Sequence, residues 1–172
     1  MMQKYVRPRF GRMLLLALAI GAVATPLLLT SRSAEAIIAI LIGLRSGPVG
    51  LTRGTEGTFG VYLPTSRSVR TPLPVVNTIT DGTSNTIFAR ENLTLVPGGP
   101  CGWVHVKVFE NGSVQLNGRA LGITVPEDGR LQLVSQVTTQ APKGTTLVGS
   151  VQVSELATNR VLALLPYIEQ DN

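Results

Sequence analysis

The stretch WVHVKVF, residues 103–109, constrains the fold of this chain more than any other. Its residues alternate, so that Val104, Val106 and Val108 share one face and mostly polar or aromatic side chains share the other. Successive side chains of a β-strand point to opposite faces, whereas a helix would need an apolar period near 3.6. The stretch therefore predicts a strand that buries its three valines, with Lys107 exposed.

Two Asn-Gly pairs divide the sequence that follows into short segments. Asn111-Gly112 precedes SVQL, and Asn117-Gly118 precedes RALGITV. Asn and Gly tolerate the positive φ angles that two-residue hairpin turns require. Both pairs therefore predict hairpins, and three successive antiparallel strands are expected here.

The remaining sequence after residue 36 consists of short apolar or alternating runs separated by Gly, Pro, Asn and Asp, without helical periodicity. Strands are expected at 36–44, 58–63, 75–79, 85–95, 130–137, 146–153 and 160–168. The first of these is apolar on both faces and is expected to be buried, whereas 64–74 reads as a surface loop. The pattern predicts an all-β fold, a single antiparallel β-sandwich (Ig-like or jelly-roll-like) of about 8–10 short strands.

Residues 1–36 have the pattern of an export signal. A basic head precedes the apolar run 13–30, and Ala34-Glu35-Ala36 has the small-residue spacing of a cleavage site. This order is typical of a secretory signal peptide, which would form a helix before the domain at 37–172. Mass spectrometry of the exported protein should then find Ile37 at the N-terminus. An uncleaved membrane anchor is the alternative, since the run is about as long as the shortest spanning helices.

The charge of the chain belongs mostly to this leader. The sequence pI is near 10.0, but ten basic and nine acidic residues remain after position 36. A nearly neutral domain gives no reason to expect nucleic-acid binding. We expect an exported protein, secreted, periplasmic or on the cell surface, that contacts a membrane only through its N-terminal segment if that segment is retained.

Residues with catalytic chemistry are few. His105 is the only histidine and Cys101 the only cysteine, and in an extended strand they would lie roughly 13 Å apart. Cys101 is expected to be a buried small residue, with an intermolecular disulfide as the alternative. No nucleophile, phosphate-binding or zinc motif occurs in the sequence. We therefore expect no catalytic residue and no cofactor.

The stretch TITDGTSNTIF, residues 78–88, can be read as a turn or as a metal loop. Asp81, Ser84 and Asn85 offer oxygen ligands to a hard cation, but the loop contains only one carboxylate. A turn is favoured, in which Asp81 accepts hydrogen bonds from backbone N–H groups two or three residues later. Gly82 is expected to adopt a backbone angle that other residues resist.

The segment ITDGTSNTI, residues 79–87, resembles a motif of exported pseudopilin-like bacterial proteins of the H-x9-DG family. Glu91 follows it as a glutamate follows the motif in that family. The stretch VQVSELATNRVLALLP, residues 151–166, is similar to the last hairpin of small secreted bacterial β-sandwich proteins of unknown function. The resemblances imply an exported, non-catalytic envelope protein, and neither transfers a functional residue.

Three functions follow as hypotheses. The first is an exported bacterial β-sandwich protein with a structural or binding role at the cell envelope or outside the cell, whose partner is a protein or a glycan. The second is a secreted hydrolase with a site made from dispersed carboxylates. The third is a membrane-anchored pseudopilin-like subunit.

Overall fold

All the regular secondary structure in the described residues is β-strand. The computed structural model describes residues 39–65, 67 and 69–170, so the expected leader at 1–36 lies outside the described residues. Within that part of the chain there are eleven strands and no helix. The strands are β1 Ala39–Ser46, β2 Val49–Leu51, β3 Thr55–Tyr62, β4 Leu73–Asp81, β5 Ile87–Leu95, β6 Gly102–Val108, β7 Ser113–Leu116, β8 Arg119–Thr124, β9 Leu131–Pro142, β10 Val148–Glu155 and β11 Val161–Gln170.

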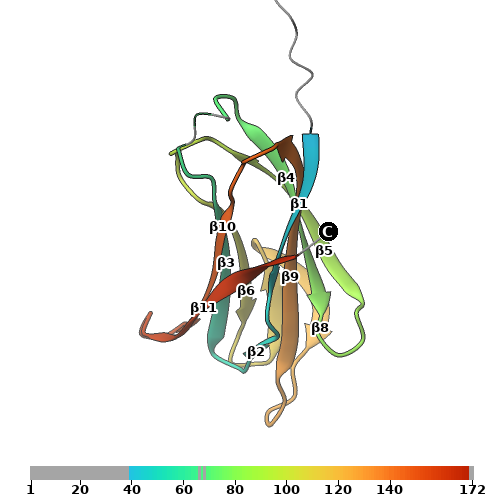
Figure 1. Ribbon diagram of the computed structural model, residues 1–172. Coiled ribbons are helices and arrows are strands. Elements are labelled where there is room, and N and C mark those ends of the chain that lie inside the picture. The colour runs from blue at the N-terminus through green and yellow to red at the C-terminus, as the bar shows by residue number, and fades with distance from the viewer. Residues whose placement is uncertain (1–38, 66, 68, 171–172) are drawn as a thin grey trace, which may run out of the picture. The chain divides into compact units, whose positions relative to one another are not determined.

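Every strand pair is antiparallel, which confirms the predicted fold class (Figure 1). Sheet A has the order β5-β4-β9-β1, and β2 also pairs with β9. Sheet B has the order β10-β3-β6-β7-β8. The two sheets are joined through β11, so that they form one continuous sheet that curves back on itself.

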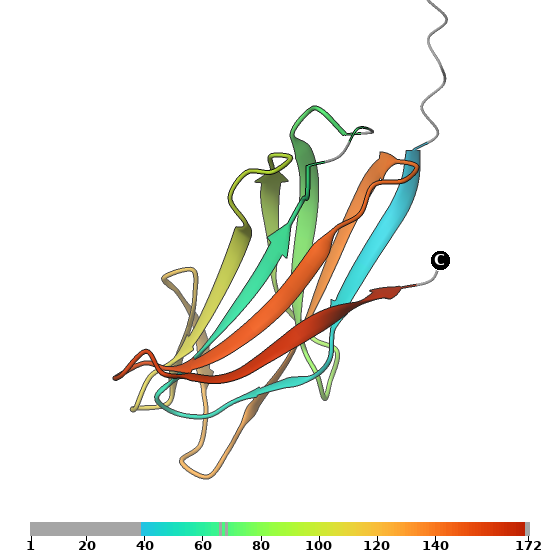
Figure 2. The ribbon, with the colours of Figure 1, turned by 60° about the vertical axis from the view of Figure 1, so that its left-hand side comes forward.

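Strand β11 belongs to both sheets. Its residues from Val161 to Pro166 pair with β10, and its residues from Tyr167 onward pair with β1. The strand therefore crosses from one layer to the other (Figure 2). One side of the sandwich is closed by backbone hydrogen bonds, while β5 and β8 end the order on the other side.

The core lies between the inward faces of the sheets. Val104, Val106 and Val108 are completely buried, as the alternation predicts, and Lys107 on the opposite face keeps 42% of its side chain exposed. Phe59 on β3 is also completely buried and is the largest such side chain. Inward-facing Val, Leu and Ile residues from both sheets complete the core.

A buried chain of hydrogen bonds holds β11 against sheet A. The hydroxyl of Tyr167 donates to Oγ of Ser135 at 2.6 Å, and the Ser135 hydroxyl donates to Oδ1 of Asn77 at 2.7 Å. Burial raises the pKa of Tyr167 to about 12, so the phenol stays neutral and remains a donor at ordinary pH. Polar groups this deep need partners, so the chain of bonds fixes the position of Tyr167.

The first strand differs from its prediction. Ile42 and Leu44 are buried, but Leu41 is 56% exposed and Ile40 is 37% exposed. The segment 36–44 is apolar throughout, yet the first three residues of β1, Ala39 to Leu41, are exposed. The prediction that this strand is buried on both faces is therefore wrong for its first half.

The predicted surface loop 64–74 is also shorter than expected. Strand β4 begins at Leu73, and both Leu73 and Val69 are buried. Pro74 is accommodated within β4 although it lacks an N–H group. Val69 anchors the loop to the core, so the loop is not wholly a surface feature.

The two Asn-Gly pairs form different turns. Asn117 and Gly118 both have positive φ, at 46° and 80°, and connect β7 to β8 in two residues as predicted. At the other pair only Gly112 has positive φ, at 81°, and a four-residue loop connects β6 to β7. The Gly112 N–H donates to the Phe109 carbonyl at 2.8 Å, which tightens this loop. Phe109 therefore lies outside the strand in which the sequence placed it.

Candidate functional site

The outer face of sheet B carries the only tryptophan of the chain on a regular ladder of side chains. Gly60 of β3 pairs with Trp103 of β6 on one side and with Ser150 of β10 on the other. Neighbouring rungs of the ladder are formed by polar residues. We call this surface the platform: Trp103, His105, Lys107, Glu56, Thr58, Gly60, Ser150 and Gln152.

Trp103 lies directly over the backbone of Gly60. A Cβ atom on Gly60 would overlap the six-membered ring of Trp103, so only glycine leaves room for the indole at this place. The side chain remains 44% exposed, although a tryptophan normally contributes a large buried area. The β-sheet thus holds a large aromatic group in a defined position while leaving much of it open to solvent.

The polar part of the platform is organised around Glu56. Its side chain is only 15% exposed, and its Oε1 lies 2.8 Å from Nδ1 of His105. Oε2 lies 3.9 Å from Nζ of Lys107, and Thr58 Oγ1 lies 3.4 Å from the same His105 nitrogen. Glu56 therefore orients His105 beside Trp103, and Thr58 makes a longer contact with the same ring nitrogen.

His105 and Cys101 do not form a catalytic pair. Trp103 lies between them in the sequence, and β6 runs extended from Gly102 onward. Cys101 is a free thiol that is partly exposed, so the expectation that it is buried is wrong. The imidazole of His105 instead lies 2.8 Å from the carboxylate of Glu56.

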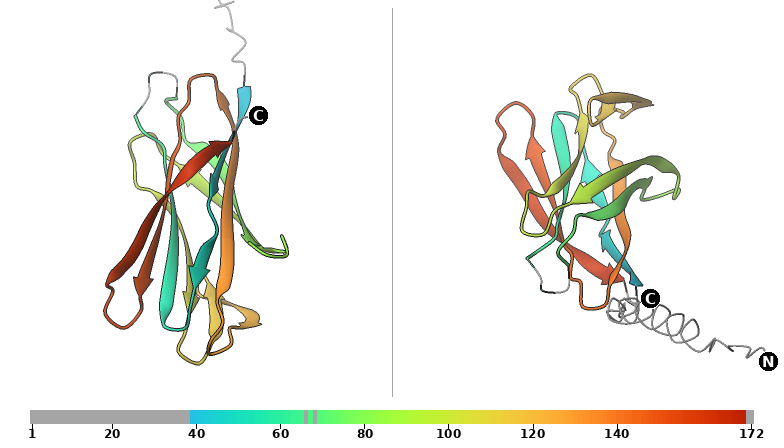
Figure 3. Two further views of the ribbon diagram at one scale, coloured as in Figure 1. Left: turned by 60° about the horizontal axis from the view of Figure 1, so that its bottom comes forward. Right: turned by 90° about the horizontal axis from the view of Figure 1, so that it is seen from above.

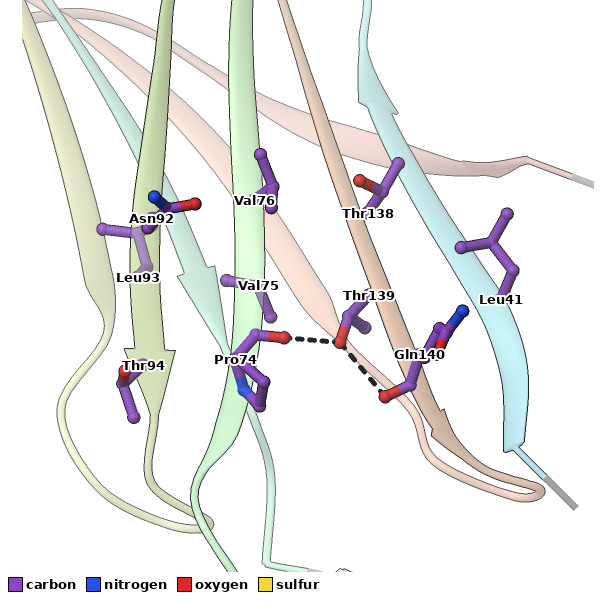
Figure 4. Close-up of a pocket in the computed structure, with 10 residues that line it drawn as sticks. All are labelled: Leu41, Pro74, Val75, Val76, Asn92, Leu93, Thr94, Thr138, Thr139 and Gln140. Carbon is purple, nitrogen blue, oxygen red and sulfur yellow. Dashed lines mark hydrogen bonds between the residues drawn. The ribbon is translucent and has the colours of Figure 1, made fainter.

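A second candidate surface is a groove on the outer face of sheet A (Figure 4). The groove has a volume of about 420 Å³ and extends over β5, β4, β9 and β1. Its lining combines apolar residues with amides and hydroxyls: Leu41, Pro74, Val75, Val76, Asn92, Leu93, Thr94, Thr138, Thr139 and Gln140. None of these side chains is charged, so the groove suits a neutral ligand.

A side-chain hydrogen bond extends the backbone pairing between the central strands of the groove, β4 and β9. Oγ1 of Thr139 donates to the carbonyl of Pro74 at 2.7 Å, which joins β9 to β4 at a place where Pro74 supplies no N–H (Figure 4). Asn92 and Gln140 lie on either side of this bond in the view. The groove therefore has a rigid floor but only amides and hydroxyls with which to orient a ligand.

The third candidate, the stretch 78–88, forms the predicted turn between β4 and β5. Oδ1 of Asp81 accepts hydrogen bonds from the N–H groups of Thr83 at 2.6 Å and Ser84 at 3.2 Å. Asn85 has the positive φ of the turn, 56°, whereas Gly82 lies outside that region, so the prediction for Gly82 is wrong. The amide N–H of Asn85 donates to the carbonyl of Asp81 at 2.9 Å and closes the turn.

We expect replacement of Asp81 by alanine to lower the melting temperature by a few degrees with or without calcium. The backbone N–H group of Thr83 makes the largest contribution to lowering the pKa of Asp81 below its ordinary 3.8, and the N–H group of Ser84 makes the next. The stabilisation by the ionised Asp81 carboxylate is thus fully present above pH 3.8, and it is lost as the pH falls through the lower pKa of Asp81 in the folded protein. Thermal melts of both proteins at neutral and acidic pH measure the difference.

The response to calcium distinguishes a metal site from a turn in the wild type and Asp81→Ala. If Asp81, Ser84 and Asn85 bind a cation, calcium will raise the melting temperature of the wild type, chelator will lower it, and Asp81→Ala will respond to neither. Thr83→Ala serves as a matched control, because it keeps the backbone N–H that donates to Asp81 and removes none of the three candidate ligands. A calcium-dependent shift confined to the wild type and this control would replace the turn interpretation by a metal site.

The described part of the chain holds no cluster of three or more His, Cys, Asp or Glu residues arranged for a metal ion. In the same residues no helix is long and apolar enough to cross a membrane. Comparison with protein-family models, curated proteins and solved structures finds no match for the chain. The resemblance of residues 79–87 to the H-x9-DG family therefore stays a prediction.

The sequence placed Trp103 and His105 on one face but did not identify the platform. The missing partner was Gly60, which lies inside the alternating run TFGVYL. Glycine within a strand often marks a close approach of another group. That signal was present in the sequence, but it did not show which group approaches, since Gly60 and Trp103 are far apart along the chain.

Proposed function

We propose that this chain is an exported, non-catalytic binding protein of the bacterial envelope or of the space outside the cell, and that its platform binds a neutral glycan. The observation that carries the proposal is the position of Trp103, which is held over Gly60 yet left 44% exposed. The apolar C–H face of a sugar ring matches the face of an aromatic ring, and an ordered ring loses little entropy when the sugar binds.

The neighbours of Trp103 supply hydrogen bonds suited to sugar hydroxyls. Ser150 lies on the same rung as Gly60, and Gln152 lies on the next rung beside Thr58. His105 is oriented by Glu56 at 2.8 Å, so its position is defined before a ligand arrives. An aromatic ring flanked by fixed polar groups is the usual composition of a recognition site for a polar ligand.

The platform is favoured over the groove on sheet A because only the platform offers an aromatic surface. The groove has a comparable supply of amides and hydroxyls, but its apolar lining is aliphatic. Tryptophan and tyrosine contribute disproportionately to binding energy in protein interfaces. Tyr62, two residues beyond Gly60 on β3, adds a second partly exposed aromatic side chain to this face.

We expect Trp103→Ala to abolish glycan binding, because it removes the stacking surface. The test uses soluble neutral oligosaccharides of β-1,4-glucose, β-1,4-N-acetylglucosamine and α-1,4-glucose. The chain contains one tryptophan, so intrinsic fluorescence reports on the platform directly in the wild type. Isothermal titration calorimetry then compares wild type and variant, with Trp103→Phe expected to retain part of the affinity.

Two further variants separate the platform from the groove. Gly60→Val should displace the indole and weaken binding, since a Cβ there would overlap the ring. Asn92→Ala, in the groove, should leave binding unchanged. Loss of binding with Asn92→Ala but not with Trp103→Ala would move the site to sheet A, and failure of all three oligosaccharide series would contradict the proposal for neutral glycans.

A further inference from the structure

The crossing of β11 leaves a notch in the wall of the sandwich. Strand β1 pairs with the end of β11 from Tyr167 onward, but β2 continues along β9 after β11 has turned away toward β10. Strands β2 and β11 therefore diverge, as the left view of Figure 3 shows. The space between them has a volume of about 520 Å³.

Both sides of the notch are strand edges that lack a strand partner in the described part of the chain. Residues 161–165 of β11 pair with β10 on one edge only, and β2 pairs with β9 on one edge only. The N–H and C=O groups of such an edge can accept one more strand. The segment 161–165 contains no charged residue that would oppose such pairing.

The lining of the notch combines apolar and polar surface, and it reaches the core. Leu162, Ala163 and Leu165 come from β11, while Val49 and Val153 are buried core residues that lie beneath them. Leu162 is 48% exposed and Leu165 is 37% exposed. Apolar side chains of an inserted strand would therefore be removed from water by residues that already pack against the core.

Arg130 is the only charged residue that lines the notch. It is exposed, and the ion pairs formed within the described residues join Glu56 to His105 and Lys107, and Glu155 to Arg160. A carboxylate on an incoming chain would therefore meet a cation that has no acidic partner there. The charge of Arg130 therefore favours a ligand that carries a carboxylate over a wholly apolar ligand.

We propose that the notch binds an extended segment of another polypeptide, with alternating apolar residues and an adjacent carboxylate, as an added strand between β11 and β2. The backbone of the segment would pair with residues 161–165, its apolar side chains would fill the space above Val49 and Val153, and its carboxylate would meet Arg130. Added-strand binding draws affinity from main-chain hydrogen bonds and specificity from alternate side chains.

The test uses a fluorescein-labelled peptide of eight alternating valines and threonines with an aspartate at each end, added to the full chain. We expect saturable binding by fluorescence anisotropy, with amide chemical-shift changes concentrated at 161–165 and 49–51. Leu162→Lys should weaken binding tenfold or more. Leu164→Lys is the matched control, since Leu164 is on the same strand, is 68% exposed and does not line the notch.

A charge exchange and a backbone control complete the test. Arg130→Glu should weaken binding of the aspartate peptide and strengthen that of a peptide with lysine at its ends. A peptide with proline at alternate positions, which lacks the N–H donors, should not bind. Equal binding of the proline peptide, or equal loss in Leu164→Lys and Leu162→Lys, would overturn the proposal. A concentration-dependent dimer that Leu162→Lys abolishes would overturn it in favour of a second copy.

Discussion

Replacement of Val106 by aspartate is expected to lower the free energy of unfolding by several kcal/mol. Val106 is completely buried on β6, opposite Gly57 of β3 and Leu116 of β7. An ionised carboxylate there would have no partner, and a protonated one would still lack hydrogen bonds, so the cost is several kcal/mol. Domains of this size are stabilised by only about 5–15 kcal/mol in total. Urea unfolding followed by far-UV circular dichroism measures the loss.

Thr124→Asp is the matched control for this substitution. It introduces the same side chain on β8, which is separated from β6 by β7 in sheet B, at an exposed position. Surface substitutions of this kind usually change the free energy of unfolding by less than about 0.5 kcal/mol. Equal urea midpoints for the Val106 and Thr124 variants would show that Val106 is not part of the core.

Replacement of Phe59 by alanine is expected to destabilise the domain by about 3–5 kcal/mol, the usual cost of removing a buried aromatic ring. Phe59 is completely buried between Val104 of β6 and Val151 of β10, its partners in the two adjacent strands. The flanking strands are paired on both sides, so they cannot collapse into the space without breaking backbone hydrogen bonds. The free energy of unfolding in urea is the quantity to compare.

Phe59→Leu keeps most of the apolar volume and is expected to lose much less stability than Phe59→Ala. The pair of variants separates the cavity from the loss of the aromatic ring. If both variants lose the same free energy, then ring contacts and not cavity volume determine the cost. If neither loses stability, the packing of β3 between β6 and β10 is not what stabilises this part of the domain.

The sequence predicted those features that depend on neighbouring residues. The alternation at Val104, Val106 and Val108 identifies a core-facing strand because side-chain direction has a strict period of two. The turn at Asp81 was predicted because its carboxylate bonds to groups only two and three residues away. At Asn117-Gly118 the backbone preference of the residues themselves decides the turn.

The features that failed depend on partners distant in the chain. The exposure of Leu41 follows from which strands cover β1, and an apolar run does not show this. Strand β2 was missed because three residues carry too little periodicity to distinguish a strand from a loop. The platform requires Gly60 and Trp103 to meet in register, and the notch requires β11 to change layers, so neither could be read from local pattern.

The pairing of β1 with β11 also has a consequence for the order of folding. These strands are the first and last of the domain, with more than a hundred residues between their paired positions. Contacts between such distant segments slow folding, because a long loop must be closed before they contribute. During synthesis the residues of β11 are made after those of the other ten strands. The layers can associate earlier through their apolar faces, but the wall between β10 and β1 stays open until translation of this strand is complete.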